Sequence, residues 1–111
     1  MSDYRAGMME IMQLVKDERQ RQEQKWGEQN HEPLIWMAIL AEEFGEACKA
    51  VLEGDDEGYP VELIHVAAVA IAAAECWERI GSAALGLPSI VDLQQQCHNL
   101  AAENAELKGE T

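Results

Sequence analysis

The chain has few basic residues. Eight lysines and arginines stand against twenty-one aspartates and glutamates, which gives a formal net charge of −13. This acidic balance argues against binding nucleic acid or an anionic membrane through a basic face. An anionic ligand would have to be accompanied by cations. We therefore expect no nucleic-acid partner and no membrane partner.

Cysteine is also scarce. Cys48, Cys76 and Cys97 are an odd number with no metal-like spacing, which predicts buried free thiols in a reducing compartment. The N-terminal MSDYRAGMMEIMQ lacks the basic region and apolar block of a secretory signal. The apolar stretch 61–77 is interrupted by charged residues and is short for a membrane span. We expect a soluble, cytoplasmic protein.

Strand signals are few, and apolar residues recur at helical spacing, so an all-α fold is predicted. The first expected helix is 3–25, with an apolar stripe followed by the polar tail DERQRQEQK. The second, 33–54, begins at a proline and ends at a glycine. The third, 61–79, is apolar nearly all round, so we expect it to be buried on several sides and to stop at Gly81.

A fourth helix is expected from Ser89, which forms a capping pair with Asp92. We divide the chain into a helical domain, 1–82, and a linker with a C-terminal amphipathic helix, 83–111. That helix has a short heptad pattern, which predicts either a dimerisation seam or packing on its own domain. The pattern consists of Leu93, Cys97, Leu100, Asn104 and Leu107.

Carboxylates fall on the core-facing side of the second expected helix. Glu43 lies on its apolar stripe and Glu46 lies beside it, within the sequence EExxE that begins at Glu42. Burying unpaired carboxylates is costly and clustered carboxylates repel one another, so a cation is expected there. The alternative is that Glu42 and Glu46 are solvated and paired with Lys49.

A second polar pair opens the third expected helix, where Glu62 and His65 share one face. If the two helices are antiparallel neighbours, Glu43 faces this pair. Oxygen ligands suit Mg²⁺ or Mn²⁺, and a nitrogen ligand shifts the preference toward transition metals. A hydrogen-bonded core histidine is the alternative for His65.

These motifs resemble those of a known family. The EExxE motif, a fifteen-residue gap and Glu62, preceded by ERQRQEQKWGEQNHEP, are similar to the MazG-like all-α nucleoside triphosphate pyrophosphohydrolases. The resemblance covers roughly residues 5–80. It implies a helical bundle completed by dimerisation, as a homodimer or homotetramer. It also implies Mg²⁺-dependent hydrolysis of a nucleoside or deoxynucleoside triphosphate to the monophosphate and pyrophosphate.

The resemblance also implies roles for individual residues. The metal ligands would be Glu43, Glu46, Glu62 and His65. Glu42 and Glu43 would be catalytic, with Glu42 as a further ligand or as the residue that handles water. The candidates for substrate contacts are Arg21, Lys25 and Lys49 for phosphate and Trp26 or Trp36 for the base, although Trp36 also fits a helix core.

His65 stands where the family has aspartate, which removes one anionic ligand. Weaker Mg²⁺ catalysis, use of Mn²⁺ or another transition metal, and a catalytically weak or inactive assembly protein all remain open. A further alternative, which ranks below these, takes Glu62-x-x-His65 as one half of a di-iron carboxylate site. A homodimer would have to supply the other half in a four-helix bundle.

Overall fold

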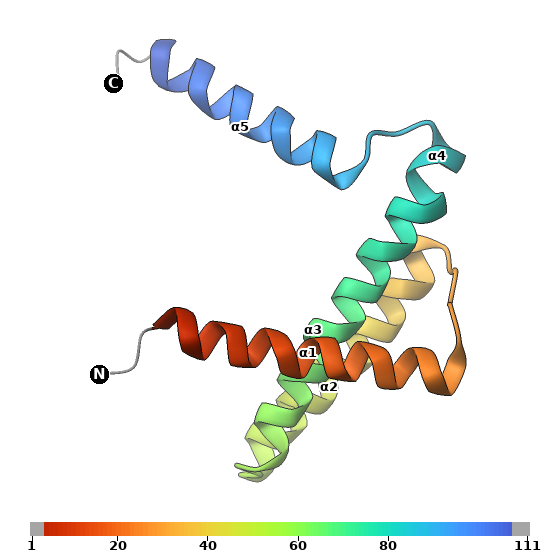
Figure 1. Ribbon diagram of the computed structural model, residues 1–111. Helices are drawn as coiled ribbons and strands as arrows, with labels where there is room; N and C mark the ends of the chain where they lie inside the picture. Colours follow the sequence, from red (N-terminus) through yellow and green to blue (C-terminus); the bar gives the residue numbers. More distant parts are fainter. Residues whose placement is uncertain (1–3, 108–111) are drawn as a thin grey trace. The chain divides into compact units, whose positions relative to one another are not determined.

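The structure is a computed structural model that describes residues 4–107, and these residues contain helices and turns but no strand. This confirms the all-α prediction. The elements are α1 (Tyr4–Trp26), α2 (Pro33–Glu53), α3 (Gly58–Cys76), a π-helical turn η1 (Trp77–Gly81), α4 (Ser82–Leu85) and α5 (Ile90–Leu107) (Figure 1).

The chain forms two compact units, Met1–Ala73 and Ala74–Thr111, with α3 beginning in the first and ending in the second. The expected domain limit after residue 82 stays a prediction. All the residues expected at the metal site belong to the first unit.

The ends of the first two helices follow from proline and glycine. Pro33 is the first residue of α2, and Gly54 ends it in the left-handed conformation with φ 69°. Gly27 ends α1 in the same conformation, with φ 73°, and its N–H donates to the Glu23 carbonyl at 2.7 Å. These positions agree with the sequence prediction. The predicted first residue of the first helix, Asp3, lies outside the described residues.

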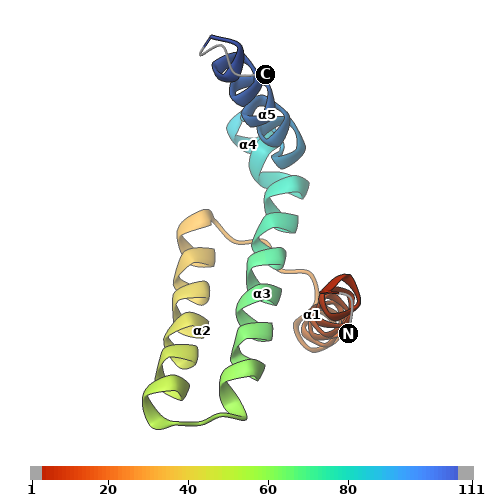
Figure 2. The same cartoon turned by 90° about the vertical axis from the view of Figure 1, so that its left-hand side faces the viewer.

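A short turn joins α2 and α3 into an antiparallel helical hairpin, and α1 crosses α3 on the side away from α2 (Figures 1 and 2). In the turn the Asp55 carboxylate accepts a hydrogen bond from the Gly58 N–H at 2.9 Å. This cap explains why α3 begins three residues before the predicted start at residue 61.

The buried core of the first unit is made mostly of small side chains. Its buried hydrophobic residues are Val15, Trp36, Ala47, Ala50, Ala68, Val69 and Ala72. On α3 the side chains of Val61, Leu63 and Ile71 are 44% to 51% exposed. The expectation that this helix is buried on several sides is therefore wrong for the single chain, since α1 and α2 leave part of its surface open.

Gly81 does not stop the third helix, contrary to expectation. Its φ is −66°, and the helix continues through η1 and α4 to Gly86, where φ is 64°. A Cβ at Gly81 would lie 2.8 Å from Cε3 of Trp77. Glycine therefore makes room for the Trp77 ring inside a π-helical turn.

The start of α5 confirms the predicted cap, because the Ser89 hydroxyl accepts a hydrogen bond from the Asp92 N–H at 3.2 Å. Leu93 and Leu100 on its apolar stripe are exposed. The two interpretations of this stripe, dimerisation and packing on its own domain, both stay predictions.

The prediction of buried cysteines holds only for Cys76, whereas Cys48 and Cys97 are exposed. Cys48 lies on the face of α2 directed away from the core, and Cys97 lies on the exposed helix α5. Apolar neighbours in the sequence therefore do not ensure that a thiol is covered.

The continuous helical stretch Gly58–Leu85 has the length and composition to cross a membrane, a test that the core helix of a soluble protein also passes. The helix is therefore longer than the apolar stretch 61–77, which by itself is short for a span. Four charged residues, Glu62, Glu75, Glu78 and Arg79, interrupt it. The expected absence of a membrane partner and the cytoplasmic location stay predictions.

Candidate metal centre

Three half-buried side chains meet between α2 and α3. Glu43 comes from α2, Glu62 and His65 come from α3, and one ligand atom of each lies within 4.8 Å of the others. His65 Nδ1 is 3.3 Å from Glu62 Oε2 and 3.7 Å from Glu43 Oε2. The predicted meeting of these three residues across an antiparallel helix pair is confirmed.

The spacing and chemistry of these atoms suit a divalent cation. Two donors bonded at about 2.1 Å to one ion lie about 3.0 to 3.4 Å apart, depending on the coordination angle. The distance of 3.3 Å, which is also that of a hydrogen bond between His65 and Glu62, lies in this range, and the distance of 3.7 Å needs a small side-chain adjustment to reach it. Two carboxylates and one imidazole form a donor set that Mg²⁺, Mn²⁺ and other transition metals accept.

The environment of Glu43 indicates that the chain alone does not complete this site. Its Oε2 atom is buried and has no hydrogen-bond partner among residues 4–107. Burial raises the pKa of the Glu43 carboxyl above its ordinary value, and the nearby Glu46 and Glu62 carboxylates raise it further, while His65 opposes them. A buried, unpaired carboxylate beside like charges is costly unless a cation joins it.

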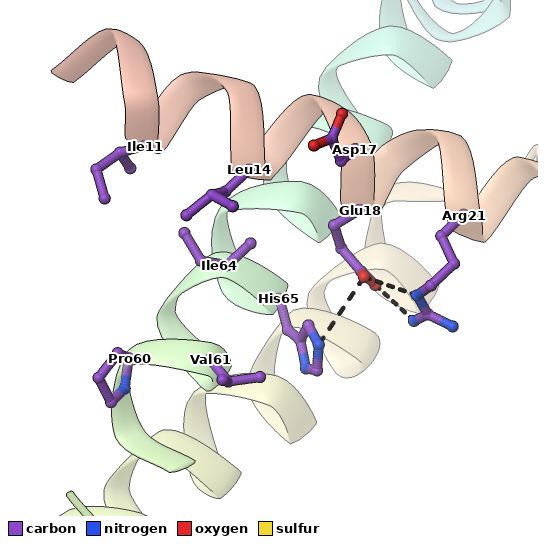
Figure 3. Close-up of a pocket in the computed structure, with 9 residues that line it drawn as sticks. All are labelled: Ile11, Leu14, Asp17, Glu18, Arg21, Pro60, Val61, Ile64 and His65. Atoms are coloured by element: carbon purple, nitrogen blue, oxygen red, sulfur yellow. Dashed lines mark hydrogen bonds and ion pairs between the residues drawn. The ribbon is translucent and has the colours of Figure 1, made fainter. Parts of the chain in front are cut away.

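Glu18 on α1 is a site residue that the sequence did not identify. Its Oε1 lies 4.0 Å from His65 Nε2 (Figure 3). The other ring nitrogen, Nδ1, is the one near Glu43 and Glu62. Histidines that ligate metals commonly direct their other ring nitrogen at a carboxylate, which orients the ring. Glu18 is therefore placed to hold His65 with Nδ1 toward the other two donors.

Glu18 is also hydrogen-bonded within α1. Its carboxylate accepts hydrogen bonds from Arg21 Nε at 2.7 Å, from Arg21 Nη2 at 2.6 Å and from Gln22 Nε2 at 3.1 Å. The hydrogen bonds and positive charge of Arg21 lower the pKa of the Glu18 carboxyl below its ordinary value. The sequence signal that could have identified Glu18 is its spacing. Ile11, Val15 and Glu18 are separated by four and then three residues, which puts Glu18 on the apolar side of the helix.

A cavity of about 380 Å³ opens beside the three donors, among α1, α2 and α3. Of the predicted site residues it is lined by Arg21, Trp26, Glu43, Glu46, Glu62 and His65. Its lining also includes Glu18 and the buried ring of Trp36. Four carboxylates against one guanidinium make the cavity strongly acidic, so a polyanion would enter it only together with cations.

Three predicted residues lie away from this cavity. Glu42 is exposed and is not among its lining residues. The Lys25 ammonium lies 4.8 Å from the centre of the Trp26 ring. Lys49 points away from the site and approaches Glu53 at 4.0 Å, so it does not pair with Glu42 or Glu46 as the alternative reading required.

A second cavity, of about 410 Å³, lies on the other side of the Glu18–His65 pair, between α1 and α3 (Figure 3). Apart from Asp17, Glu18, Arg21 and His65, its lining is apolar. Glu18, Arg21 and His65 thus form a polar wall shared by an acidic cavity and an apolar groove.

Trp36 is the second residue of the acidic cavity with an unsatisfied buried atom. Its ring is 4% exposed, and its indole Nε1 has no hydrogen-bond partner in the described part of the chain. The ring packs edge-on against His31, with centroids 5.0 Å apart. Native structures leave few such atoms unpaired, so the cavity presents two buried polar atoms that water or a ligand inside it can satisfy.

Comparison of the chain with family models, with curated proteins and with solved structures finds no match. The MazG-like resemblance therefore depends on the motifs alone.

Proposed function

We propose that the chain is a divalent-metal-dependent nucleoside triphosphate pyrophosphohydrolase, which releases pyrophosphate and a nucleoside monophosphate. The observation that carries this proposal is the convergence of Glu43, Glu62 and His65, with ligand atoms within 4.8 Å, at the edge of an acidic cavity. The same residues carry the resemblance to the MazG-like family. The homodimer or homotetramer that this resemblance implies is part of the proposal.

In this proposal Glu43, Glu62 and His65 hold the cation, which is Mg²⁺ or, because of the imidazole ligand, Mn²⁺. A bound divalent cation supplies the charge neutralisation that a triphosphate needs in so acidic a cavity. Glu18 orients His65 from behind, as expected for a carboxylate next to a ligating histidine.

The remaining residues of the cavity suit substrate contacts. Arg21 lies at the wall, where its guanidinium could reach a phosphate while Glu18 fixes its position. Trp26 is half exposed at the rim and offers a face for stacking on a base. Glu46 is solvent-exposed and lines the cavity, so it is better placed than Glu42 to accept a proton from the attacking water.

The experiment that tests the proposal is hydrolysis of a panel of nucleoside and deoxynucleoside triphosphates with Mg²⁺ and then Mn²⁺. Pyrophosphate and orthophosphate are separated and measured. We expect pyrophosphate release that is lost in Glu43→Gln and retained in Glu53→Gln, an exposed glutamate on the same helix outside the cavity. Absence of pyrophosphate with every nucleotide and both metals would contradict the proposal.

A further inference from the structure

The acidic cavity changes in character along the hairpin of α2 and α3. At one end the hairpin contributes the three candidate metal ligands. At the other end it contributes Trp36 and Ile39 from α2 and Val69 and Ala72 from α3. A molecule that fills the cavity therefore meets ionisable groups at one end and a largely apolar wall with one indole ring at the other.

Each end of the cavity has one buried polar atom without a hydrogen-bond partner among residues 4–107. These atoms are Oε2 of Glu43 and Nε1 of Trp36. The two residues are seven apart on α2, so they lie on one face about 10.5 Å apart along the helix. An ionised carboxylate only accepts hydrogen bonds and an indole N–H only donates them. A ligand that satisfies both atoms therefore brings a cation to one end and a hydrogen-bond acceptor to the other.

The surroundings of Trp36 favour a neutral acceptor. A phosphate placed against Ile39, Val69 and Ala72 would lose its hydration without a counter-ion, whereas a carbonyl oxygen loses much less. The Gln22 amide, which also lines the cavity, is already bonded on both sides. It donates to Glu18 and accepts from Arg19, both at 3.1 Å. The acceptor that suits the indole N–H is therefore a carbonyl oxygen of the ligand.

We infer that Trp36 determines the base preference of the substrate, by selecting bases that carry a carbonyl group at the ring position farthest from the sugar. The inference rests on the proposed function, which puts the phosphates at the cation beside Glu43 and thereby directs the base toward Trp36. Uracil, thymine and guanine present a carbonyl oxygen at that position, whereas cytosine and adenine present an amino group. An amino group facing the indole N–H would leave two buried donors without an acceptor.

The test compares how tightly uridine and cytidine triphosphate analogues bind in the presence of Mn²⁺, measured by titration calorimetry. In both analogues a methylene group replaces the oxygen between the α and β phosphorus atoms, so the proposed reaction cannot proceed. We expect the uridine analogue to bind about 10- to 100-fold tighter. Trp36→Phe keeps an aromatic ring but removes the N–H, and it should reduce this ratio to roughly 3-fold or less.

Trp77→Phe is the matched control, because Trp77 belongs to the second unit and is not among the residues that line the cavity. It should leave both affinities unchanged. Equal binding of the two analogues to the wild type overturns the inference, and so does a preference that survives in Trp36→Phe. Failure to bind either analogue overturns it as well.

The outcome for base preference is separable from the outcome for hydrolysis. Pyrophosphate release without a preference for uridine would leave the proposed function standing and the inference wrong. A preference that Trp36→Phe abolishes, in a protein that releases no pyrophosphate, would support the inference and contradict the hydrolysis.

A third analogue keeps the test decisive if Trp36→Phe fails to fold. Its base, 2-pyrimidinone, has neither a carbonyl nor an amino group at position 4. Bound to the wild type, it loses the acceptor of uracil but avoids the opposed donor of cytosine, so its affinity should fall between those of the other two. If it binds as tightly as the uridine analogue, Trp36 does not recognise the carbonyl group and the inference is wrong.

Discussion

Two glutamates on opposite sides of His65 differ in what surrounds them. Glu18 receives three hydrogen bonds from Arg21 and Gln22, and its carboxyl pKa is lowered. Glu43 has a buried oxygen without a hydrogen-bond partner among the described residues, and its carboxyl pKa is raised. The chain thus supplies a guanidinium for Glu18, whereas the one basic group that this part of the chain places near Glu43 is the His65 imidazole. A carboxylate that lacks a neutralising partner is typical of functional sites, whereas a carboxylate in an ion pair is typical of structural sites.

The largest expected effect is on metal affinity. Glu43→Gln removes an anionic ligand, so Mn²⁺ binding should weaken on the order of 100-fold or more, while Glu18→Gln should weaken it by roughly 10-fold through the orientation of His65. Titration calorimetry with Mn²⁺ measures both. If Glu43→Gln binds Mn²⁺ as tightly as the wild type, Glu43 is not a metal ligand, and the proposed difference between Glu43 and Glu18 is wrong.

The next effect concerns the choice of metal. His65→Asp replaces a nitrogen ligand with an anionic oxygen, and we expect Mg²⁺ to bind about 10-fold tighter relative to Mn²⁺. Competition between the two ions, followed by the electron paramagnetic resonance of free Mn²⁺, gives this ratio. An unchanged ratio of Mg²⁺ to Mn²⁺ affinity would place His65 outside the metal site. Glu43 would then have no nitrogen ligand beside it.

Without metal, the two glutamates should have opposite effects on stability at neutral pH. Glu18→Gln loses charge-assisted hydrogen bonds and should lower the free energy of unfolding by about 1–2 kcal/mol. Glu43→Gln removes an unpaired buried charge and should raise it by about 1 kcal/mol. Urea unfolding in the presence of a chelator measures both. Destabilisation by both substitutions would mean that Glu43 has a partner of its own.

The smallest effect is on the pH dependence of stability. A lowered carboxyl pKa, as at Glu18, contributes stability that is present above the ordinary value of 4.5 and is lost as pH falls through the lowered pKa. A raised one, as at Glu43, contributes stability that is present below 4.5 and is lost as pH rises through the raised pKa. Substituting each by glutamine should therefore change the slope of unfolding free energy against pH in opposite directions, measured from about pH 3 to about pH 7.

Much of this site could be predicted from periodicity. Spacing placed Glu62 and His65 on one face, and a short turn after Gly54 made an antiparallel hairpin with Glu43 opposite them. Spacing from Ile11 and Val15 puts Glu18 on the apolar side of α1, but its approach to His65 depends on where α1 crosses the hairpin, which no local pattern specifies. The exposure of Cys48 was missed for a related reason, because an apolar run in the sequence does not reveal which face of its helix the rest of the chain covers.

Gly54 lies midway along the sequence between the cavity-lining residues of α2 and those of α3. The residues of α2 and α3 that line the acidic cavity fall into pairs equally distant from it. Glu46 and Glu62 are eight residues away, Glu43 and His65 eleven, Ile39 and Val69 fifteen, and Trp36 and Ala72 eighteen. The hairpin places residues at equal distances from Gly54 opposite one another. Glu43 and His65 therefore meet about 16 Å from Gly54 along the helices. The pairing of these residues therefore depends on the length of the turn between α2 and α3.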